Sequence, residues 1–342
     1  MRILLTADPE LPVPPGQYGG IERLVDLWRG ELRTRGHSIA LAARHDSTAE
    51  VDAFFPWPGS RSQDRGDALR NSIALWRAAL HFRAEIVHSS SRLIYTLPLL
   101  LARIPVVMTY HRWPGTRQIR IAARLGGKRL AFTGVSAFIA GIGRAGGGHW
   151  HVVHNCIDLA RLRYEPAVPS NAPLVFLSRI ESVKGAREAI QIARAAGVPL
   201  VLAGNHSADE NAARYWRDEI APEIDGTNVT YLGPVNDEQK SALLGHARGL
   251  LVPVQWDEPF GLVFAEALAC GTPVITTPRG ALPEIVRENE NGFLIRTPDE
   301  GVRAVHQLSR LSRAACRRDA EARFAPAASI DRFLPIYSAV RG

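Results

Sequence analysis

Short apolar runs and longer amphipathic stretches alternate along the first half of this chain. Runs rich in β-branched residues predict strands at 2–6, 39–42, 86–88, 105–110, 131–135 and 151–153. Apolar positions recurring at helical spacing predict helices at 21–35, 67–81 and 91–102 between them. The first strand begins at the first residues, and we interpret the opening MRILLTADPE as that strand rather than as a signal peptide.

The same alternation restarts after residue 166. Strands are predicted at 174–177, 199–203, 229–232, 249–252 and 273–276, and helices at 187–196, 237–246 and 262–269. Strands alternating with helices indicate βαβ units and a mostly parallel sheet, here twice over. We therefore predict an α/β fold of two Rossmann-like domains facing a cleft, with ligands bound at the carboxyl ends of the strands.

A proline-rich segment, 164–173, separates the two halves and is the natural linker. We expect a first domain at 1–163 and a second at 164–324. The last helical stretch, 325–342, carries Phe333, Leu334, Ile336 and Tyr337 and needs an apolar partner. It is a candidate to pack back on the first domain, although its sequence does not choose between the two.

Composition narrows the class of protein. A chain of 342 residues with 46% hydrophobic residues suits two globular domains, and no apolar stretch is long enough to cross a bilayer. Three widely spaced cysteines, Cys156, Cys270 and Cys316, indicate neither a disulfide framework nor a zinc site. We expect a cytoplasmic protein, with a peripheral position on the inner face of the membrane as an option.

The net charge of +7 is unevenly distributed. No Asp or Glu occurs from 86 to 157, a stretch with nine basic residues: Arg92, Arg103, Arg112, Arg117, Arg120, Arg124, Lys128, Arg129 and Arg144. Such a region attracts phosphates, an anionic membrane surface or nucleic acid. Four of these residues, at 117, 120, 124 and 128, recur at helical spacing, which fits either a solvated basic face or a surface that docks on anionic lipid or a phosphorylated acceptor.

The strongest motif is Asp-Glu-Pro-Phe-Gly-Leu-Val-Phe-Ala-Glu, residues 257–266, between a predicted strand and helix. Glu258 lies in the loop and Glu266 just over one turn inside the helix, so both can face one ligand. Gly261 permits close backbone approach, and the exposed amides of Phe260, Gly261 and Leu262 favour an anion at the helix start.

Two further motifs follow predicted strands. Ser-Arg-Ile-Glu-Ser-Val-Lys-Gly, residues 178–185, supplies Arg179 and Lys184 as cations for a diphosphate. Residues 14–22, Pro-Pro-Gly-Gln-Tyr-Gly-Gly-Ile-Glu, place Gly19 and Gly20 at the start of the first helix, where amides can meet a phosphate or a sugar. His111 directly follows the strand predicted at 105–110, a position that favours a role in ligand binding over a purely structural one.

Together these motifs resemble glycosyltransferase family 4, which has GT-B architecture, from residue 14 to residue 294. Glu258 and Glu266 match its E-x7-E signature, and His111 matches the histidine that contacts the transferred sugar. Asn155-Cys156-Ile157-Asp158 is similar to the family's N-G-V-D turn, but Cys156 stands where a glycine would allow positive φ. Arg112 replaces the family's frequent acid, which affects acceptor contacts more than donor contacts.

The resemblance implies a metal-independent, retaining hexosyltransferase. Arg179 and Lys184 would hold the donor pyrophosphate, Glu258 the sugar hydroxyls and Glu266 the ribose, with amides at 260–262 and the loop at Gly19 and Gly20 completing the donor site. We expect a UDP-sugar such as UDP-glucose, with GDP-mannose next, and an acceptor hydroxyl in glycan, lipopolysaccharide, exopolysaccharide or glycoconjugate synthesis. The acceptor itself is unidentified, with a lipid-linked or anionic molecule as an option, and no cofactor is expected.

Other readings remain open. A nucleotide-sugar epimerase or hydrolase would use the same fold, and a non-enzymatic protein could bind nucleotides or nucleic acid through the basic half. Few aromatic residues interleave the arginines, which makes nucleic acid a poor candidate.

Two other motifs carry no site. A Gly-x-Gly-x-x-Gly at 141–146 precedes a strand instead of following one, so we interpret it as a turn. His149, His151 and His154 lack a fitting carboxylate, so no metal site is predicted.

Overall fold

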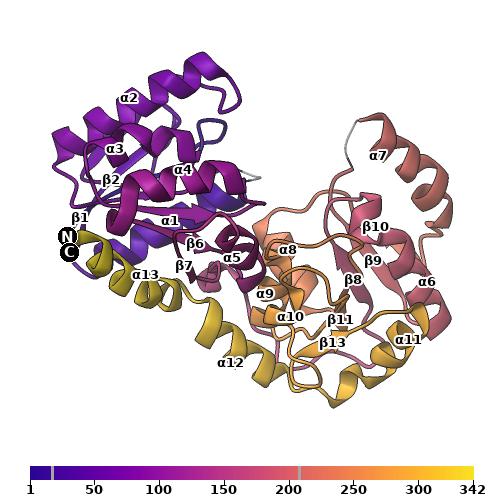
Figure 1. Cartoon of the computed structure of the whole chain (residues 1–342). Helices are drawn as coiled ribbons and strands as arrows, with labels where there is room; N and C mark the ends of the chain where they lie inside the picture. The colour runs from indigo at the N-terminus through magenta and orange to yellow at the C-terminus, as the bar shows by residue number, and fades with distance from the viewer. Residues whose placement is uncertain (17–18, 207–208) are drawn as a thin grey trace. The chain divides into compact units, whose positions relative to one another are not determined.

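The computed structural model describes residues 1–16, 19–206 and 209–342, and the chain forms two compact units (Figure 1). The first unit contains Met1–Ile157 together with Pro326–Gly342, and the second contains Asp158–Ala325. Each unit is built on a parallel sheet with helices, which confirms the predicted α/β fold. None of the helices in the described part of the chain is both long and apolar enough to span a bilayer.

The first unit holds a seven-stranded parallel sheet in the order β3-β2-β1-β4-β5-β6-β7. Its strands are β1 (Arg2–Thr6), β2 (Ser38–Ala43), β3 (Ala53–Pro56), β4 (Ile86–Ser89), β5 (Val106–Tyr110), β6 (Leu130–Gly134) and β7 (His149–Val152). The central strands are buried along almost their whole length because helices cover both faces of the sheet. The sequence pattern missed only β3 among these strands, a four-residue edge strand that is at most half-buried and ends in proline.

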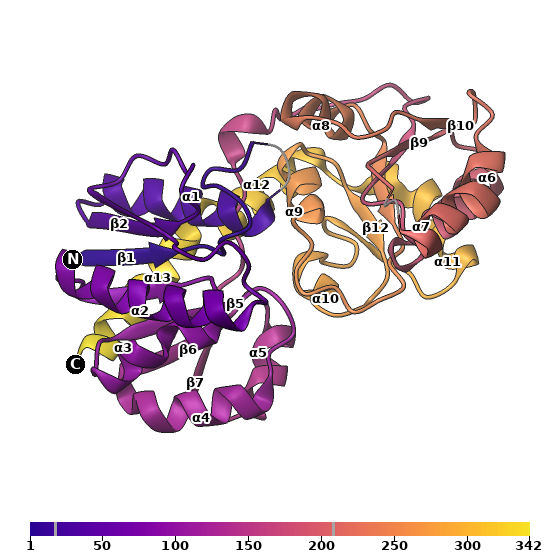
Figure 2. The same ribbon diagram turned by 90° about the horizontal axis from the view of Figure 1, so that it is seen from above.

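Helices α1 (Gly20–Thr34) and α13 (Pro326–Arg341) lie on one face of this sheet, and α2 (Arg65–Phe82), α3 (Leu97–Leu101) and α4 (Thr116–Gly126) on the other (Figure 2). Successive residues of β4 show the two faces. Val87 joins the core under α2, α3 and α4, whereas the next residue, His88, contacts α13. The predicted helix at 91–102 is a short 3-10 turn, η1 (Leu93–Thr96), followed by α3. The remaining elements are η2 (Gly127–Arg129) and α5 (Ala137–Arg144).

Helix α13 belongs to the first unit although it closes the sequence. Its apolar face supplies Phe333 and Tyr337, which are fully buried. The Ser329 hydroxyl donates to the His154 carbonyl at 2.9 Å, and Arg35 pairs with Asp331 at 2.6 Å. These contacts complete the face of the sheet that α1 leaves partly uncovered.

The second unit has a six-stranded parallel sheet in the order β10-β9-β8-β11-β12-β13. Its strands are β8 (Leu174–Leu177), β9 (Leu200–Ala203), β10 (Val229–Tyr231), β11 (Gly249–Val252), β12 (Val274–Thr276) and β13 (Gly292–Leu294). The longer helices are α6 (Ala186–Ala196), α7 (Glu210–Tyr215), α8 (Asp237–Gly245), α9 (Leu262–Ala269), α11 (Pro298–Gln307) and α12 (Arg313–Phe324). Shorter elements are η3 (Leu159–Arg161), η4 (Ser182–Lys184), η5 (Trp216–Ile220), η6 (Ala221–Glu223), α10 (Leu282–Ile285) and η7 (Leu308–Arg310).

The chain crosses between the units slightly before the proline-rich segment expected to be the linker. The boundary falls between Ile157 and Asp158. The segment that follows is held within the second unit, because the Arg163 amide donates to Ser241 Oγ at 2.9 Å and the Glu165 amide donates to the Cys270 carbonyl at 3.1 Å. Cys156, expected to strain the turn here, does not have positive φ.

Candidate active site

A lysine, a glutamate and a tryptophan meet at the carboxyl end of the second unit's sheet. Lys184 Nζ lies 2.6 Å from Glu258 Oε2, and Trp256 Nε1 donates to the same oxygen at 2.9 Å. The Lys184 ammonium also stands 4.7 Å from the centre of the Trp256 ring. The side chains of Lys184 and Glu258 are only 11% and 13% exposed, so their attraction is weakly screened. We call these three residues the Lys184 cluster.

Glycine lets the two loops that carry this cluster approach each other. Gly185, directly after Lys184, has φ +81, and a Cβ there would lie 2.1 Å from the Pro253 carbonyl oxygen. The Gln255 amide also donates to the Val183 carbonyl at 2.8 Å. The end of β8 and the end of β11 are thereby fixed side by side, which brings Lys184 to Glu258 across 74 positions of sequence.

Helix α9 begins immediately beside the cluster. Gly261 caps it with φ +88 and offers no side-chain acceptor to the amides of the first turn, while the Phe264 amide donates to the Gly261 carbonyl at 3.2 Å. Phe260 is buried and anchors this end, while Gly261 and Leu262 remain half-buried. The Ala281 amide donates to the Glu258 carbonyl at 2.8 Å, which holds the loop from the other side. The partial positive charge at the start of α9 and the Lys184 ammonium together favour an anionic ligand.

Glu266, one turn into α9, is paired with a lysine that the sequence motifs did not include. Lys240 Nζ on α8 lies 2.6 Å from Glu266 Oε1 and 3.4 Å from Asp237. Lys240 is separated from Glu266 by 26 positions and belongs to no motif, so only the packing of α8 on α9 reveals it. The sequence motifs also did not include Trp256, although it lies only two positions before Glu258.

Arg179 is placed differently from Lys184. Its guanidinium pairs with Glu181 at 2.7 Å, and its side chain is 45% exposed. Within residues 158–206 and 209–325, no ion pair joins Arg179 to the Lys184 cluster. It is therefore an exposed cation near the end of β8 and not a member of the buried pair.

The first unit carries its own polar pocket at the carboxyl ends of β1, β4 and β5. It has a volume of about 320 Å³ and is lined by residues that include Asp8, Ser90, Arg92, His111 and Arg112. His111 Nε2 lies 3.2 Å from Ser90 Oγ, and the imidazole stacks on Trp28 with 6.0 Å between ring centres. Burial lowers the pKa of His111 to about 3, so the imidazole is neutral and one ring nitrogen can accept a proton or a hydrogen bond.

Two carboxyl groups that the sequence motifs did not single out flank this pocket. Burial raises the pKa of Asp8 to about 7, with Glu10 adding to the effect and Arg112 opposing it. Burial also raises the pKa of Glu22, which lies in the first turn of α1. Asp8 Oδ1 is buried without a hydrogen-bond partner among the described residues.

The glycine loop ends at the same pocket. Gly19 has φ +153, and a Cβ there would lie 2.6 Å from the Pro15 side chain and 3.1 Å from the Glu22 carboxylate. Gly20 then begins α1. Gln17 and Tyr18 of this loop lie outside the described residues. Gly19 and Gly20 thus stand beside buried carboxyl groups within the first unit.

Behind His111, a buried polar chain ties the sheet to α13. His88 Nδ1 lies 2.7 Å from the Tyr337 hydroxyl, and His88 Nε2 lies 2.7 Å from Thr109 Oγ1. Trp28 stacks on His88 with ring centres 5.1 Å apart. Burial lowers the pKa of His88 to about 3, so it stays neutral. Trp28 therefore stacks on both His88 and His111, and it connects His111 with the hydrogen-bonded side chains of His88, Thr109 and Tyr337.

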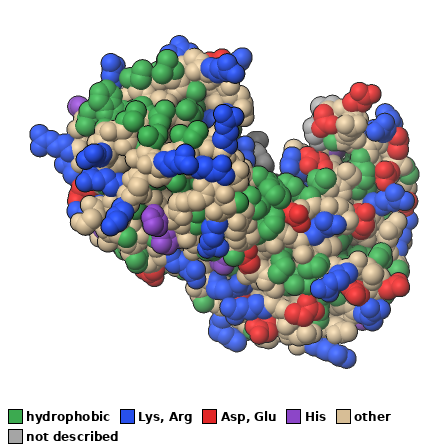
Figure 3. All heavy atoms as spheres, viewed as in Figure 1, with side chains coloured by type: hydrophobic (Ala, Val, Ile, Leu, Met, Phe, Trp, Pro, Cys, Tyr) green, Lys and Arg blue, Asp and Glu red, His purple; other side chains and the backbone are tan. Residues whose placement is uncertain are grey.

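Exposed basic residues form a face on and beside α4. Arg117, Arg120 and Arg124 lie on α4, and Lys128 and Arg129 on the η2 turn, all of them exposed. We call these five residues the basic face; Figure 3 shows Lys and Arg side chains gathered over this part of the first unit. No ion pair involving them occurs among the described residues. No group of three His, Cys, Asp or Glu side chains that could hold a metal ion was found among residues 1–16, 19–206 and 209–342.

Both units match models of known protein families. The model of the glycosyl transferases group 1 family matches residues 165–323, and that of glycosyltransferase family 4 matches residues 18–161. The D-inositol 3-phosphate glycosyltransferase of Mycobacterium marinum is 32% identical over 133 residues, covering 38% of this chain and 28% of that relative. The phosphatidyl-myo-inositol mannosyltransferase of Mycobacterium tuberculosis is 25% identical over 327 residues, covering 86% and 82% of the two chains.

Among solved structures, HepE from Anabaena in complex with UDP and glucose shares the fold, with a TM-score of 0.75 over 99% of each chain and 18% identity. Two parallel sheets of seven and six strands, the two family models that match one unit each, and this likeness agree with one another. The chain belongs to glycosyltransferase family 4, has GT-B architecture, and is a glycosyltransferase.

Proposed function

We propose that this enzyme is a retaining hexosyltransferase that moves a sugar from a nucleotide-diphosphate sugar to an acceptor hydroxyl in glycan or glycoconjugate synthesis. The Lys184 cluster at the start of α9 carries the proposal, because it combines a little-exposed cation, a carboxylate and the N-terminus of a helix in one place. A UDP-sugar such as UDP-glucose is the favoured donor, and GDP-mannose comes next. The crystal structure of HepE in complex with UDP-glucose and the mannosyltransferase relative support these two choices.

In this proposal the second unit holds the donor. Lys184 and Arg179 neutralise the pyrophosphate, Glu258 accepts hydrogen bonds from sugar hydroxyls, and Glu266 does so from ribose hydroxyls. The backbone amides of Phe260, Gly261 and Leu262 add further donors. Lys184 and Lys240 orient the two glutamates before the donor arrives, because each ammonium lies 2.6 Å from its carboxylate.

The first unit would contribute Gly19, Gly20 and His111. The neutral imidazole of His111 suits contact with a sugar hydroxyl, because an imidazolium could only donate. The acceptor hydroxyl attacks the anomeric carbon on the face that the diphosphate leaves. The bond from that carbon to the β-phosphate oxygen breaks as the new glycosidic bond forms, and the hydroxyl proton passes to a phosphate oxygen. Configuration at the anomeric carbon is therefore retained.

Metal independence is part of the proposal, since Lys184, Arg179 and the start of α9 supply the positive charge that the leaving diphosphate needs. A calorimetric screen of UDP-, GDP-, ADP- and TDP-sugars in EDTA tests the donor assignment. We expect one sugar nucleotide to bind in EDTA as well as in Mg²⁺. Binding that is lost in EDTA would contradict metal independence, and no binding of any sugar nucleotide would contradict the donor site.

Incubating the donor alone tests the transferase assignment against the alternatives. A transferase consumes the donor slowly without an acceptor, whereas an epimerase or hydrolase converts it at full rate. We expect UDP release to rise at least tenfold when an acceptor is added. UDP release at the same rate with and without any acceptor would support the hydrolase instead, and conversion of the donor into an isomeric sugar nucleotide without UDP release would support the epimerase.

A peripheral position on a cytoplasmic anionic membrane surface also belongs to this proposal. The basic face supplies five exposed cations, and a cation near an anionic surface contributes ~1 kcal/mol. Sedimentation with vesicles that contain phosphatidylglycerol should be strong at low salt and weak at high salt. Absence of sedimentation at low salt would remove membrane docking from the proposal.

A further inference from the structure

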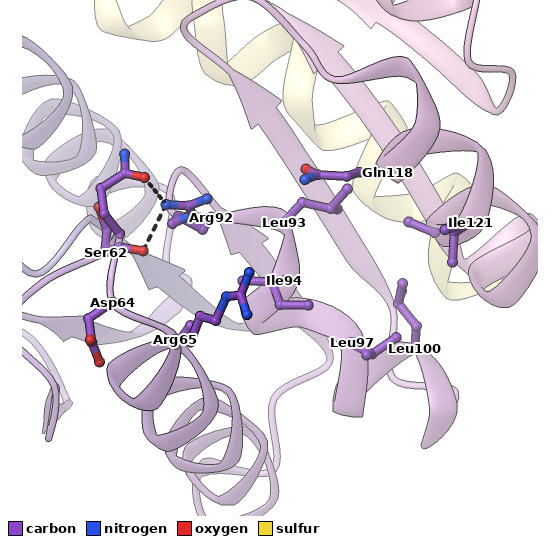
Figure 4. A pocket seen from close by; sticks show the side chains of 13 residues that line it. Ser62, Asp64, Arg65, Arg92, Leu93, Ile94, Leu97, Leu100, Gln118 and Ile121 are labelled. Atoms are coloured by element: carbon purple, nitrogen blue, oxygen red, sulfur yellow. Dashed lines mark hydrogen bonds between the residues drawn. The ribbon is translucent and has the colours of Figure 1, made fainter.

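A second pocket opens in the first unit, between α2, η1, α3 and α4. Its volume is about 390 Å³, within the ~300–1,000 Å³ of ordinary ligand pockets. Apolar side chains form most of its wall, among them Leu93, Leu97, Leu100 and Ile121 (Figure 4). None of the donor-site residues belongs to it. We call it the apolar pocket.

The apolar pocket adjoins the pocket that contains His111. Six residues line both: Ser62, Gln63, Arg92, Leu93, Ile94 and Gln118. The two pockets therefore lie next to each other, one at the carboxyl ends of β4 and β5 and the other against α3 and α4. A ligand with its reactive group at His111 could therefore extend into the apolar pocket past these shared residues.

Charge and polarity change along the apolar pocket. Arg92 and Arg65 lie at one end, and Leu97, Leu100 and Ile121 lie at the other (Figure 4). Arg92 is held in place because it donates to the Ser62 carbonyl at 2.8 Å and to Gln63 Oε1 at 2.9 Å. No carboxylate among the described residues forms an ion pair with Arg65, Arg92 or Arg112.

The one acid on this wall does not cancel the positive end. Asp64 caps α2, where its carboxylate accepts a hydrogen bond from the Asp67 amide at 2.8 Å. In Figure 4 its side chain points away from Arg92 and the apolar residues. Arg92, which lines both pockets, thus presents a guanidinium group to a ligand at their junction, and this group matches a phosphate. Asp8 lines the pocket that contains His111, and burial raises its pKa to about 7 while Arg112 and Arg92 oppose that rise.

The apolar end is also unusually exposed. Ile94 is 48% exposed and Ile121 is 53% exposed, although both line the pocket. Leu69 on α2 and Leu101 on α3 are more than 60% exposed nearby on the same helices. Figure 3 shows hydrophobic side chains gathered on this side of the first unit. Apolar side chains clustered at an open pocket indicate a surface that a partner covers.

We propose that the apolar pocket binds the chain of a lipid acceptor whose phosphate is held by Arg92 and Arg65 and whose hydroxyl reaches His111. The occupant is an anionic amphiphile with a single alkyl or isoprenoid chain. The identification as acceptor rests on the proposed glycosyl transfer, whereas chain binding does not. A free sugar phosphate would satisfy the guanidinium groups but would leave the apolar end in water.

Chain-length dependence of binding tests this directly. Butyl, hexyl and octyl phosphate, each below its critical micelle concentration, are titrated by calorimetry against inorganic phosphate. Full burial of a CH₂ group corresponds to about a fourfold gain in affinity, so we expect roughly two- to fourfold per added CH₂. Affinity that does not change from inorganic phosphate to octyl phosphate would overturn the proposal.

Paired variants locate the effect. Ile94→Gln with Ile121→Gln places two amides at the pocket wall, and octyl phosphate should bind at least tenfold more weakly, with inorganic phosphate unaffected. Leu69→Gln with Leu101→Gln makes the same chemical change outside the pocket lining and should leave both affinities within twofold. Equal losses of octyl phosphate affinity in the two double variants would mean that binding depends on apolar surface in general and not on the apolar pocket, and would overturn the proposal.

Two further measurements separate the possible failures. If the enzyme sediments with anionic vesicles but shows no chain-length dependence, the apolar surface docks on a membrane without taking up a chain, and the pocket assignment is wrong. UDP-glucose binding is measured on the same samples. Octyl phosphate binding without any sugar-nucleotide binding would defeat the proposed transfer, and the reverse result would defeat the lipid chain alone.

Discussion

Removing the Lys184 ammonium tests the donor site at its centre. Lys184→Met keeps most of the apolar stem and deletes the charge that lies 2.6 Å from Glu258. Glu258 then keeps only the Trp256 N–H as a partner within the cluster, at 2.9 Å. Because the pair is only slightly exposed, its loss should lower the free energy of unfolding by ~1–3 kcal/mol, between the values for surface and buried pairs.

Donor binding should weaken as well, because the deleted ammonium is the proposed partner of the donor pyrophosphate. A charge-assisted hydrogen bond to phosphate contributes ~1.5–3 kcal/mol, which corresponds to roughly 10- to 150-fold in affinity. We expect Lys184→Met to weaken UDP-glucose binding by this factor in calorimetry, while UDP-glucose still protects the wild-type enzyme against thermal unfolding. Uridine, which lacks the diphosphate, should lose much less affinity.

Arg303→Met is the matched control. Arg303 is an exposed cation on α11 in the same unit, outside the proposed site, so its removal changes the net charge by the same amount. We expect its donor affinity to stay within twofold of wild type. A folded Lys184→Met enzyme that binds UDP-glucose within threefold of wild type would refute the assignment of Lys184 to the pyrophosphate.

Three other changes probe the surrounding structure. Gly185→Ala adds a Cβ 2.1 Å from the Pro253 carbonyl oxygen at φ +81 and should lower the free energy of unfolding by at least ~2–3 kcal/mol. Gly197→Ala, at φ +66 with open space around the new Cβ, should lower it by only ~1–2 kcal/mol. Equal losses of stability in urea unfolding would mean that the close approach at Gly185 is unimportant. Asp8 has a pKa of about 7 in the folded protein against a reference value of 3.8, so its ionisation opposes folding as the pH rises from 4 to 7. Asp8→Asn should therefore raise the free energy of unfolding by ~1–3 kcal/mol at pH 8 and by almost nothing at pH 4. The same gain in stability at both pH values would contradict an effect of Asp8 ionisation. Tyr337→Phe leaves His88 Nδ1 buried without its partner and should cost ~1–3 kcal/mol, unlike Ser338→Ala on the exposed side of the same helix.

The motif of the second unit was readable from sequence because its parts are local. Gly261 and Glu266 lie on one strand–loop–helix unit, so the glycine and the apolar period predict where α9 begins and which residues stand at its start. The α/β class was predicted for a similar reason, since each strand and helix is defined within a few residues. The roles assigned to these residues are still predictions.

Most partners of these residues could not be predicted, because they come from distant parts of the chain. Lys240 belongs to no motif, and only tertiary packing sets it against Glu266. Trp256 lies just two positions before Glu258, but no motif includes it and the sequence does not show that its ring turns toward that carboxylate. The contact between His88 and Tyr337 joins positions 249 apart, and no local period encodes it. The apolar pocket has the same character, because α2, α3 and α4 each present ordinary amphipathic sequence and form the pocket only after they pack together.

The anomeric configuration of the product tests the proposed reaction most directly. UDP-glucose labelled with ¹³C at the anomeric carbon is incubated with enzyme, EDTA and a phosphate-bearing lipid acceptor, and the labelled carbon is followed by nuclear magnetic resonance. We predict a new α-linked glucosyl signal that forms together with UDP and requires both the acceptor and Lys184. A β-linked product, or free glucose that forms equally fast without an acceptor, would contradict retaining glycosyl transfer.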